Sequence, residues 1–486
     1  MRGNRTTLER SLKPHWVWAI ALGSSIGWGA FVQPTIWMEE AGPIGVIIGF
    51  SIGALLMMLI AVSYGILIKN FPVSGGEFAY AFLSLGRTHA FICGWFLTLG
   101  YICIVALNAS AFALMFKYVF PSFVQKFELY QLAGWNVYLV EILIATLILS
   151  IFGYLNIKGS KLSGSIQFYF CVVMLLGVFL LTILVGVSPS STIENIKPAF
   201  APNKSVFAAI ISIVAIAPWA FVGFDNVPQA AEEFNFSSKK AFGLIIFALI
   251  AAGLLYSLMI IVTALAKPWG ELANANNLWG TAYAVQDVLG VTGLVILVVA
   301  LSMGIFTGLN GFIVSSSRLL FAMSRAKIIP KSFSKLHPEY NTPYVGILFT
   351  AIIAMFAPWF GREVLLWIVD MSSIGVSIAY LYTCIAAYKL LQWKEPMREV
   401  QGIQSKSPGK KVIALVGVIS SIIFIGLLLI PGSPAFLGIE SLIALIIWVC
   451  LGLLFYIMKQ KEYNSIPDNE LIYLILGQHQ SNMKKK

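Results

Sequence analysis

A run of small residues interrupts the first hydrophobic segment, which extends from Trp16 to Trp37. The run GSSIGWGAF, Gly23 to Phe31, places glycines and serines at the middle of a stretch long enough to cross a membrane. Glycine weakens a helix and exposes its backbone amides and carbonyls. In lipid, unwound backbone is tolerated only where protein covers it or where it lines a cavity. The run therefore indicates a polar site at membrane depth.

A second interruption lies in the hydrophobic segment 205–230. Ala217, Pro218 and Trp219 stand at its middle, and Gly223 follows in the run APWAFVGFD. Pro218 has no amide hydrogen and crowds the preceding turn, which frees carbonyl groups upstream. Either interruption alone would be typical of packing or a kink. Two of them at corresponding positions of two halves favour a central solute site.

Composition places both interruptions in a polytopic membrane protein. Hydrophobic residues make up 59% of the 486 residues and charged residues only 11%, whereas soluble proteins carry about 25% charged residues. About 20 apolar residues cross the hydrocarbon core. The sequence predicts twelve transmembrane helices, at 15–38, 43–68, 89–120, 137–155, 164–187, 205–230, 240–266, 292–325, 343–360, 363–391, 411–431 and 436–458.

The chain is predicted to be all-α and to contain two structural repeats with the same arrangement of spans. Residues 15–187 hold spans one to five, residues 204–391 hold spans six to ten, and each half opens with a broken helix. Because five is an odd number, the second half must lie inverted in the membrane, which gives a five-plus-five inverted repeat. Two peripheral helices follow at 411–458. The ends are a short segment, 1–14, and a polar tail, 459–486, expected to be solvated or to touch lipid.

The basic residues predict the orientation. With the N-terminus inside, the inside segments hold 26 of the 32 lysines and arginines, and the outside loops hold the other six. This asymmetry follows the positive-inside rule for an even number of spans. It accounts for the net charge of +11 without a nucleic-acid partner. We expect both termini in the cytoplasm and the protein in the plasma membrane.

Four runs of the sequence are distinctive together. They are GSSIGWGAF, the stretch from Ala41 to Tyr80 that ends in GGEFAY, FVGFDNVPQAAEE from Phe221 to Glu233, and SSSRLLFAMSRAKIIPKSF from Ser315 to Phe333 with TPYVG after it. In these runs the chain resembles the amino acid–polyamine–organocation (APC) family of permeases. The resemblance implies the leucine-transporter fold and a secondary active transporter that moves a small amino acid by alternating access, with no enzyme activity and no cofactor besides a coupling ion.

An amino acid substrate brings a carboxylate and an ammonium group, and each needs a partner in a low-dielectric cavity. The resemblance implies that amides exposed in span one bind the carboxylate, because a helix N-terminus carries a positive partial charge. The carbonyl end of the first half of span six then accepts from the ammonium. The expected carboxylate-side residues are Ser24, Ser25, Ile26, Gly27, Trp28 and Gly29, and those of the ammonium and side-chain side are Ala217, Trp219, Ala220 and Phe221.

Three aromatic residues are expected near this site. Many relatives carry a small residue where this chain has Trp28. Trp28 either points away from the ligand or fills part of the pocket and restricts it to a small substrate. The resemblance places Trp219 where a ring closes over the substrate and Phe312 where span eight faces the pocket. A packing role fits all three as well.

Three acidic residues are candidates for gating or proton transfer, because charges within membrane spans are rare and usually functional. Asp225 follows the second break, at a position where relatives often carry an acid that faces the central pathway. Asp370 lies within span ten and is expected to face inward, where a helix–helix hydrogen bond is an equal alternative. Glu77 belongs to GGEFAY, after span two.

The coupling ion is left open between sodium and a proton, with exchange or uniport as further alternatives. Some relatives carry a lysine in span five in place of sodium, but counting from NIKGSKLSG puts that position at or near Met174. A sodium ion prefers oxygen ligands. The candidate sodium site comprises Gly23, Ile26, Ser315 and Ser316.

Other classes of protein fit the sequence less well. The four histidines are dispersed and form no HExxH motif, which disfavours a metalloenzyme. A repeated filter motif typical of channels is missing, and so is a sizeable soluble region typical of transporter-like nutrient sensors. Within transport, the alternatives are a small amine resembling ethanolamine or a polyamine, and an amino acid exchanger. The sequence leaves the oligomeric state open.

Overall fold

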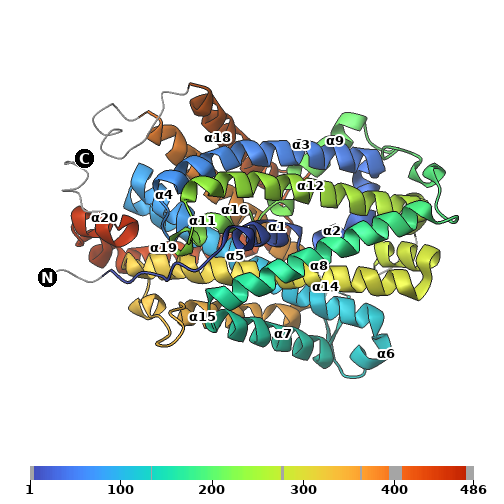
Figure 1. The fold of residues 1–486 in the computed structure, drawn as a ribbon, viewed down its shortest axis with the longest axis horizontal. Coiled ribbons are helices and arrows are strands. Elements are labelled where there is room, and N and C mark those ends of the chain that lie inside the picture. Colours follow the sequence, from blue (N-terminus) through green and yellow to red (C-terminus); the bar gives the residue numbers. More distant parts are fainter. Residues whose placement is uncertain (1–4, 133, 275–278, 362–363, 393–407, 478–486) are drawn as a thin grey trace.

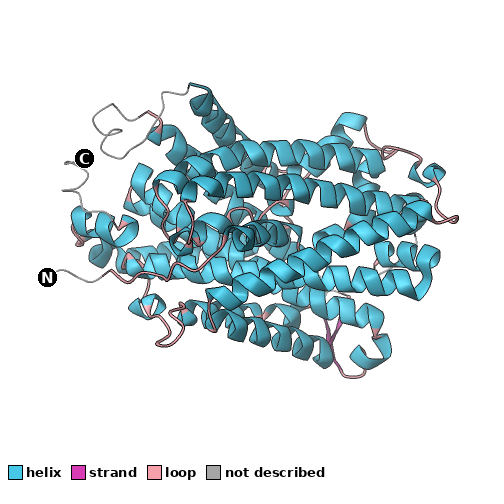
Figure 2. Cartoon of the chain, in the orientation of Figure 1, coloured by secondary structure: helices cyan, strands magenta, loops and turns pink. Residues whose placement is uncertain are grey.

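The structure is a computed structural model that describes residues 5–132, 134–274, 279–361, 364–392 and 408–477. Long helices run along the molecule's long axis, and both termini lie at one end (Figure 1). Loops are confined mainly to the two ends (Figure 2). Within the described residues, nine helices are long and apolar enough to cross a membrane. The chain is therefore a polytopic helical membrane protein.

The first half opens with the broken helix that the sequence predicts. The end of the first predicted span and the whole of the second belong to one helix, Pro34–Asn70. This helix is kinked at Gly42, where φ is 70°. The elements of this half are α1 (Pro14–Ile26), α2 (Gly29–Val32), α3 (Pro34–Asn70), α4 (Gly76–Leu85), α5 (Arg87–Val119), α6 (Pro121–Val124), β1 (Glu128–Leu132), β2 (Trp135–Tyr138), α7 (Leu139–Ile157) and α8 (Ser160–Val187).

The second half opens with short helices around the second break. The span expected at 343–360 is divided, because the α-helix ends at Ala354 and a 3-10 turn that contains Pro358 follows. The elements are η1 (Ile193–Ile196), α9 (Val206–Ala215), α10 (Ala217–Ala220), α11 (Asn226–Gln229), η2 (Ala231–Glu233), η3 (Ser238–Lys240), α12 (Ala241–Ala266), α13 (Trp269–Asn274), α14 (Gly280–Arg325), η4 (Lys331–Ser334), α15 (Tyr344–Ala354), η5 (Ala357–Phe360) and α16 (Val364–Leu390).

Three helices complete the described chain: α18 (Pro408–Leu429), α19 (Ile439–Asn464) and α20 (Asp468–Leu476). The described part of the tail, which we expected to be solvated or to touch lipid, contains α20, and this helix buries Leu471, Ile475 and Leu476 against the protein. The expected tail beyond residue 477 lies outside the described residues.

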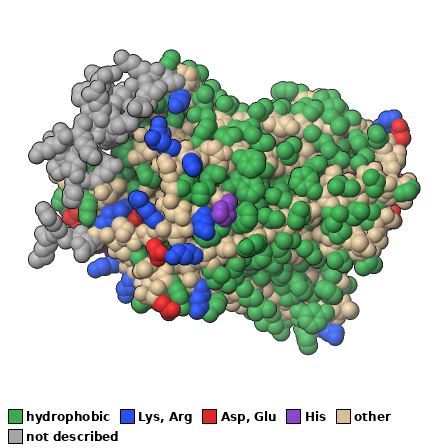
Figure 3. Space-filling model, in the orientation of Figure 1, with side chains coloured by type: hydrophobic (Ala, Val, Ile, Leu, Met, Phe, Trp, Pro, Cys, Tyr) green, Lys and Arg blue, Asp and Glu red, His purple; other side chains and the backbone are tan. Residues whose placement is uncertain are grey.

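The surface agrees with a membrane location. Hydrophobic side chains cover most of the face in Figure 3, and lysines and arginines gather at the end where both termini lie. The antiparallel hairpin of β1 and β2, which the all-α prediction did not include, connects α6 and α7.

The two broken segments lie among long helices rather than at the surface. α1 packs against α8, α12 and α14, and α10 packs against α3 and α16. The short α11 contacts both α1 and α14. Long helices therefore surround both breaks.

Candidate functional site

The first break begins where α1 ends at Ile26. Gly27 has a φ of 51°, which L side chains rarely adopt, and helical geometry resumes at Gly29. Among the described residues, the amides of Trp28, Gly29 and Ala30 donate to no backbone carbonyl. The break therefore leaves backbone donors free for another acceptor.

The second break extends further than the sequence predicts. α10 ends at Ala220, and α11 begins only at Asn226. Within this interval Gly223 has a φ of 133°, and a Cβ there would lie 2.5 Å from the amide nitrogen of Ser25. Only glycine lets the two breaks approach this closely.

Two hydroxyl groups join the breaks. The Tyr256 hydroxyl, from α12, lies 2.7 Å from the Ala220 carbonyl oxygen and 3.0 Å from that of Ser25. The Ser25 hydroxyl lies 3.1 Å from the Phe221 carbonyl oxygen. These contacts satisfy carbonyls that the interrupted helices leave without intrahelical donors. Sequence reasoning missed Tyr256, because nothing near it in the chain marks it as special.

Several polar atoms around the breaks have no hydrogen-bond partner within the described chain. They are the Ser24 hydroxyl, the Trp28 indole nitrogen, the Asn108 carbonyl oxygen and both side-chain polar atoms of Asn226. A Cβ placed on Gly311 of α14 would lie against the Ser24 hydroxyl and 3.5 Å from Asn226 Nδ2. The side chains of Ser24 and Asn226 therefore both lie beside Gly311. Buried polar atoms are normally paired, and these unpaired groups favour a polar ligand.

Asn108 is a candidate that the sequence analysis missed. Its Oδ1 lies 3.6 Å from the position of a Cβ on Gly27, which places it beside the first break. Its Nδ2 donates to the Ile104 carbonyl oxygen of its own helix at 2.9 Å. The signal was available, because an asparagine within the apolar stretch 89–120 is expensive in lipid unless it has a function or a partner.

Aromatic rings close one side of the breaks. The Trp219 ring lies over Gly29, where an added Cβ would be 2.9 Å from the indole. Trp28 meets Trp219 edge to face with ring centroids 6.3 Å apart, and Trp37 meets it at 6.5 Å. The side chains of Trp28 and Trp219 are therefore in contact, one from each break.

Asp225 is wholly buried at the end of the second break. Its carboxylate accepts from the Gly223 amide at 2.7 Å and from the Tyr101 hydroxyl at 3.0 Å. Phe312 packs on the ring of Tyr101, with ring centroids 5.6 Å apart. No ion pair to Asp225 occurs between described residues.

Glu77 is also wholly buried. It accepts from the Tyr64 hydroxyl at 3.0 Å and from Gln229 Nε2 at 2.5 Å. Tyr64 packs against Phe224, the residue before Asp225, with ring centroids 5.2 Å apart. The two carboxylates therefore belong to one cluster of hydrogen bonds and rings.

Comparison with known protein families identifies the family of this chain. The family model described as "Amino acid permease" matches residues 16–455. The chain belongs to the amino acid permease family. The resemblance to APC permeases is thereby confirmed.

Three similar proteins cover between 72% and 95% of the permease. The branched-chain amino acid permease BcaP of Bacillus subtilis (strain 168) is 25% identical over 95% of each chain. The methylthioribose transporter of the same organism is 28% identical over 94% of this chain and 95% of its own. The aromatic amino acid transport protein AroP of Escherichia coli (strain K12) is 22% identical over 72% and 74%.

Asp370 of the permease does not face inward as expected. Its Oδ2 accepts from the Ser441 hydroxyl at 2.6 Å and from the Gly438 amide at 3.3 Å, both at the start of α19. A carboxylate at this position stabilises a helix N-terminus. The helix–helix hydrogen bond is the interpretation that the contacts favour.

The four candidate sodium ligands of the permease make separate contacts. The Gly23 carbonyl oxygen lies 3.0 Å from the Thr307 hydroxyl, and the Ser316 hydroxyl lies 2.8 Å from that of Thr350. The Ile26 carbonyl oxygen is 3.5 Å from the Tyr256 hydroxyl. Ser315 is buried, and its hydroxyl has no partner within the described chain. The proposed set stays a prediction.

Gln167 of α8 links α1 to α14 in the permease. Its Nε2 donates to the carbonyl oxygens of Ala19 in α1 and Thr307 in α14, each at 3.1 Å. Its Oε1 accepts from Asn310 Nδ2 at 2.8 Å. Met174, at or near which some relatives carry a lysine in place of sodium, lies about two helical turns further along α8.

Proposed function

We propose that this permease is a secondary active transporter that moves a small amino acid across the cytoplasmic membrane by alternating access. The observation that carries the proposal is the junction of the two breaks at Tyr256, beside unpaired polar groups. Free amides at 28–30 suit a carboxylate, since unpaired donors at a helix start attract anions. The end of α9 offers carbonyls to an ammonium group.

The size of the substrate follows from the rings. Trp28 and Trp219 occupy space beside the free amides, and both side chains are more than nine-tenths buried. Two indoles beside the proposed binding groups favour a substrate with a short side chain. BcaP is named for branched-chain amino acids, which supports a small apolar substrate for this chain too.

We further propose that a proton is the coupling ion and that Asp225 carries it. A wholly buried carboxylate without an ion-pair partner in the described chain gains most from protonation. Asp225 sits between the second break and Tyr101, so a change in its charge acts directly on the break. Glu77, in the same cluster, is the second proton-linked candidate. Symport with sodium is the competing mechanism.

The orientation is part of the proposal. Lysines and arginines gather at the end of the molecule where both termini lie (Figure 3). The positive-inside rule assigns this end to the cytoplasm. The first break then lies between the cytoplasmic half-helix α1 and the outward half that begins at α2.

Purified protein in liposomes tests these proposals. We expect uptake of labelled small amino acids to rise with an inward proton gradient and to be indifferent to sodium. Uptake that requires sodium and falls on Ser315→Ala would favour the sodium site instead. Ethanolamine or a polyamine as the only solute moved would indicate an amine transporter. Binding without movement of any solute would contradict transport and favour a sensor.

A further inference from the structure

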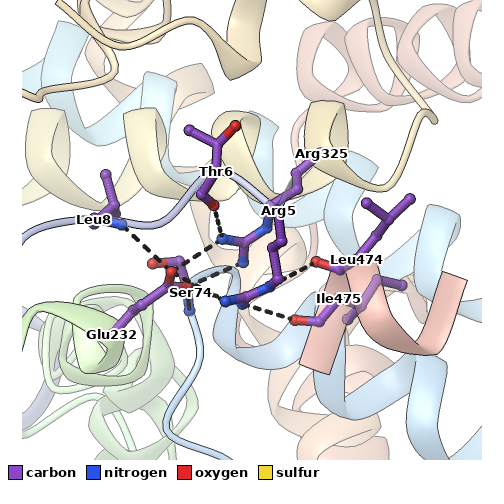
Figure 4. Close-up of polar contacts among 8 residues, drawn as sticks. All are labelled: Arg5, Thr6, Leu8, Ser74, Glu232, Arg325, Leu474 and Ile475. Atoms are coloured by element: carbon purple, nitrogen blue, oxygen red, sulfur yellow. Dashed lines mark hydrogen bonds and ion pairs between the residues drawn. The ribbon is translucent and has the colours of Figure 1, made fainter. Parts of the chain in front are cut away.

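The N-terminal segment of the chain is held by an ionic cluster beneath α1. The guanidinium of Arg5 lies 3.2 Å from the Glu232 carboxylate, which also pairs with Arg325 at 3.1 Å (Figure 4). Arg325 donates in addition to the Thr6 carbonyl oxygen at 3.0 Å. The carboxylate accepts from the amides of Leu8 at 3.4 Å and Ser74 at 3.3 Å. The Glu232 carboxylate therefore binds the N-terminal segment, the end of α14 and the loop that contains Ser74.

Backbone hydrogen bonds extend this attachment toward α1. The amides of Ser11 and Leu12 donate to the Glu233 carbonyl oxygen, each at 2.9 Å. The Asn235 amide donates to the Leu12 carbonyl oxygen at 3.1 Å. Since α1 begins at Pro14, the segment just before the first broken helix is fixed to the segment just after the second.

Arg5 has a second partner, the end of α20. Its Nε donates to the Leu474 carbonyl oxygen at 3.2 Å, and its Nη2 donates to that of Ile475 at 3.4 Å (Figure 4). These carbonyls belong to the last turn of the helix and have no intrahelical donor. Gly477 ends α20 with a φ of 68°, and a Cβ there would lie 3.1 Å from the guanidinium carbon. Arg5 thus caps α20.

The charges explain why this cap matters. Two guanidinium groups share one carboxylate, so the cluster carries an excess positive charge. Burial lowers the pKa of Arg5, and the neighbouring charge of Arg325 lowers it further. The C-terminal end of a helix carries a negative partial charge that offsets part of such an excess. Without α20, Arg5 would keep its repulsion from Arg325 and lose two acceptors.

α20 is itself anchored to helices of both halves. Lys327, just after α14, pairs with Glu470 at 2.5 Å. Arg87, at the start of α5, pairs with Asp468 at 2.6 Å and donates to the Ile466 carbonyl oxygen. The inward face of α20 is buried. The helix is therefore a fixed support for Arg5.

We propose that α20 is a latch that holds the N-terminal segment through Arg5 and so keeps α1 closed against the cytoplasmic ends of α11 and α14. The proposal rests on the alternating-access function, in which the cytoplasmic half of the first broken helix must move to release substrate. It predicts that loss of α20 or of the Arg5 guanidinium loosens the same segment. The two losses are not additive, because both remove one contact.

Cysteine labelling tests the latch without transport. Ser11→Cys is introduced into full-length protein whose five native cysteines are replaced by alanine, and its reaction with a maleimide is timed in detergent. Ser11 is buried now. We expect Arg5→Ala, or truncation after Ser465, to accelerate labelling about tenfold, the value of one charge-assisted hydrogen bond. The two changes together should accelerate it no further.

Controls separate the latch from general destabilisation. Leu471→Asp, which undocks α20 without shortening the chain, should match the truncation. Glu462→Ala, which removes an exposed ion pair on α19, should leave the rate unchanged. Unchanged labelling after truncation or Leu471→Asp, or effects that multiply in the double variant, would overturn the latch. Faster labelling in a protein that transports nothing would support the latch and contradict the transport function.

Discussion

The indole of Trp28 meets that of Trp219 edge to face, with ring centroids 6.3 Å apart. One ring comes from the first break and the other from the second. The ring of Trp28 therefore lies against the second break, and whether it restricts the size of the substrate stays a prediction. The extra ring occupies volume beside the free amides of the first break.

Trp28→Ala should therefore widen the site. We expect the preference for short over long amino acid side chains, measured as the ratio of kcat/KM values for uptake, to fall by about tenfold, the value of one or two methylenes in a pocket. Trp18→Ala is the matched control, since Trp18 stacks on Phe247 of α12. An unchanged ratio in Trp28→Ala would mean that the ring only packs.

Asp225→Asn should abolish accumulation driven by a proton gradient. The amide keeps the shape of the side chain but cannot take up or release a proton, so the break would no longer respond to pH. Counterflow of labelled substrate should persist, because it needs no net proton movement. Glu194→Gln, at an exposed ion pair, serves as control. Gradient-driven uptake that survives in Asp225→Asn would assign coupling to another group.

Tyr256→Phe should loosen the junction of the breaks. Its hydroxyl is the donor shared by the Ala220 and Ser25 carbonyl oxygens, and an unsatisfied buried acceptor costs about 1–3 kcal/mol. We expect a lower Tm in detergent and weaker substrate binding. Tyr169→Phe, at an exposed position of α8, should change neither. Equal Tm values for the two variants would refute a role for the hydroxyl.

The ionic cluster at Glu232 should be stable to mild acid. Burial alone would raise the pKa of the Glu232 carboxyl, but the guanidinium groups of Arg325 and Arg5 hold that pKa below its usual value. A lowered folded-state pKa adds stability above the unfolded-state pKa, and this stability is lost as pH falls through the folded-state pKa. The Tm difference between the wild type and Glu232→Gln should thus be constant from pH 8 to about 5 and shrink below that. A difference that vanishes near pH 6 would contradict the ion pairs.

Much of the fold was predictable from local patterns. Apolar stretches predicted about half of the spans to within four residues at each end, because lipid requires every backbone group to be paired within a helix. The first break was placed correctly at Gly27, where only glycine adopts the required φ with ease. Pro218 located the second break, but the length of this break was underestimated. Its length depends on the close approach of Gly223 to Ser25, which belongs to another helix.

The sequence by itself determined that this is a helical membrane protein of the permease type with two interrupted helices, because composition, helix length and glycine or proline act within one segment. Only the tertiary structure decided which side chains meet those breaks. Tyr256 and Asn108 come from helices distant in sequence. The contact between α20 and Arg5 could not be predicted either, because the sequence of a short amphipathic helix does not reveal which surface it packs against.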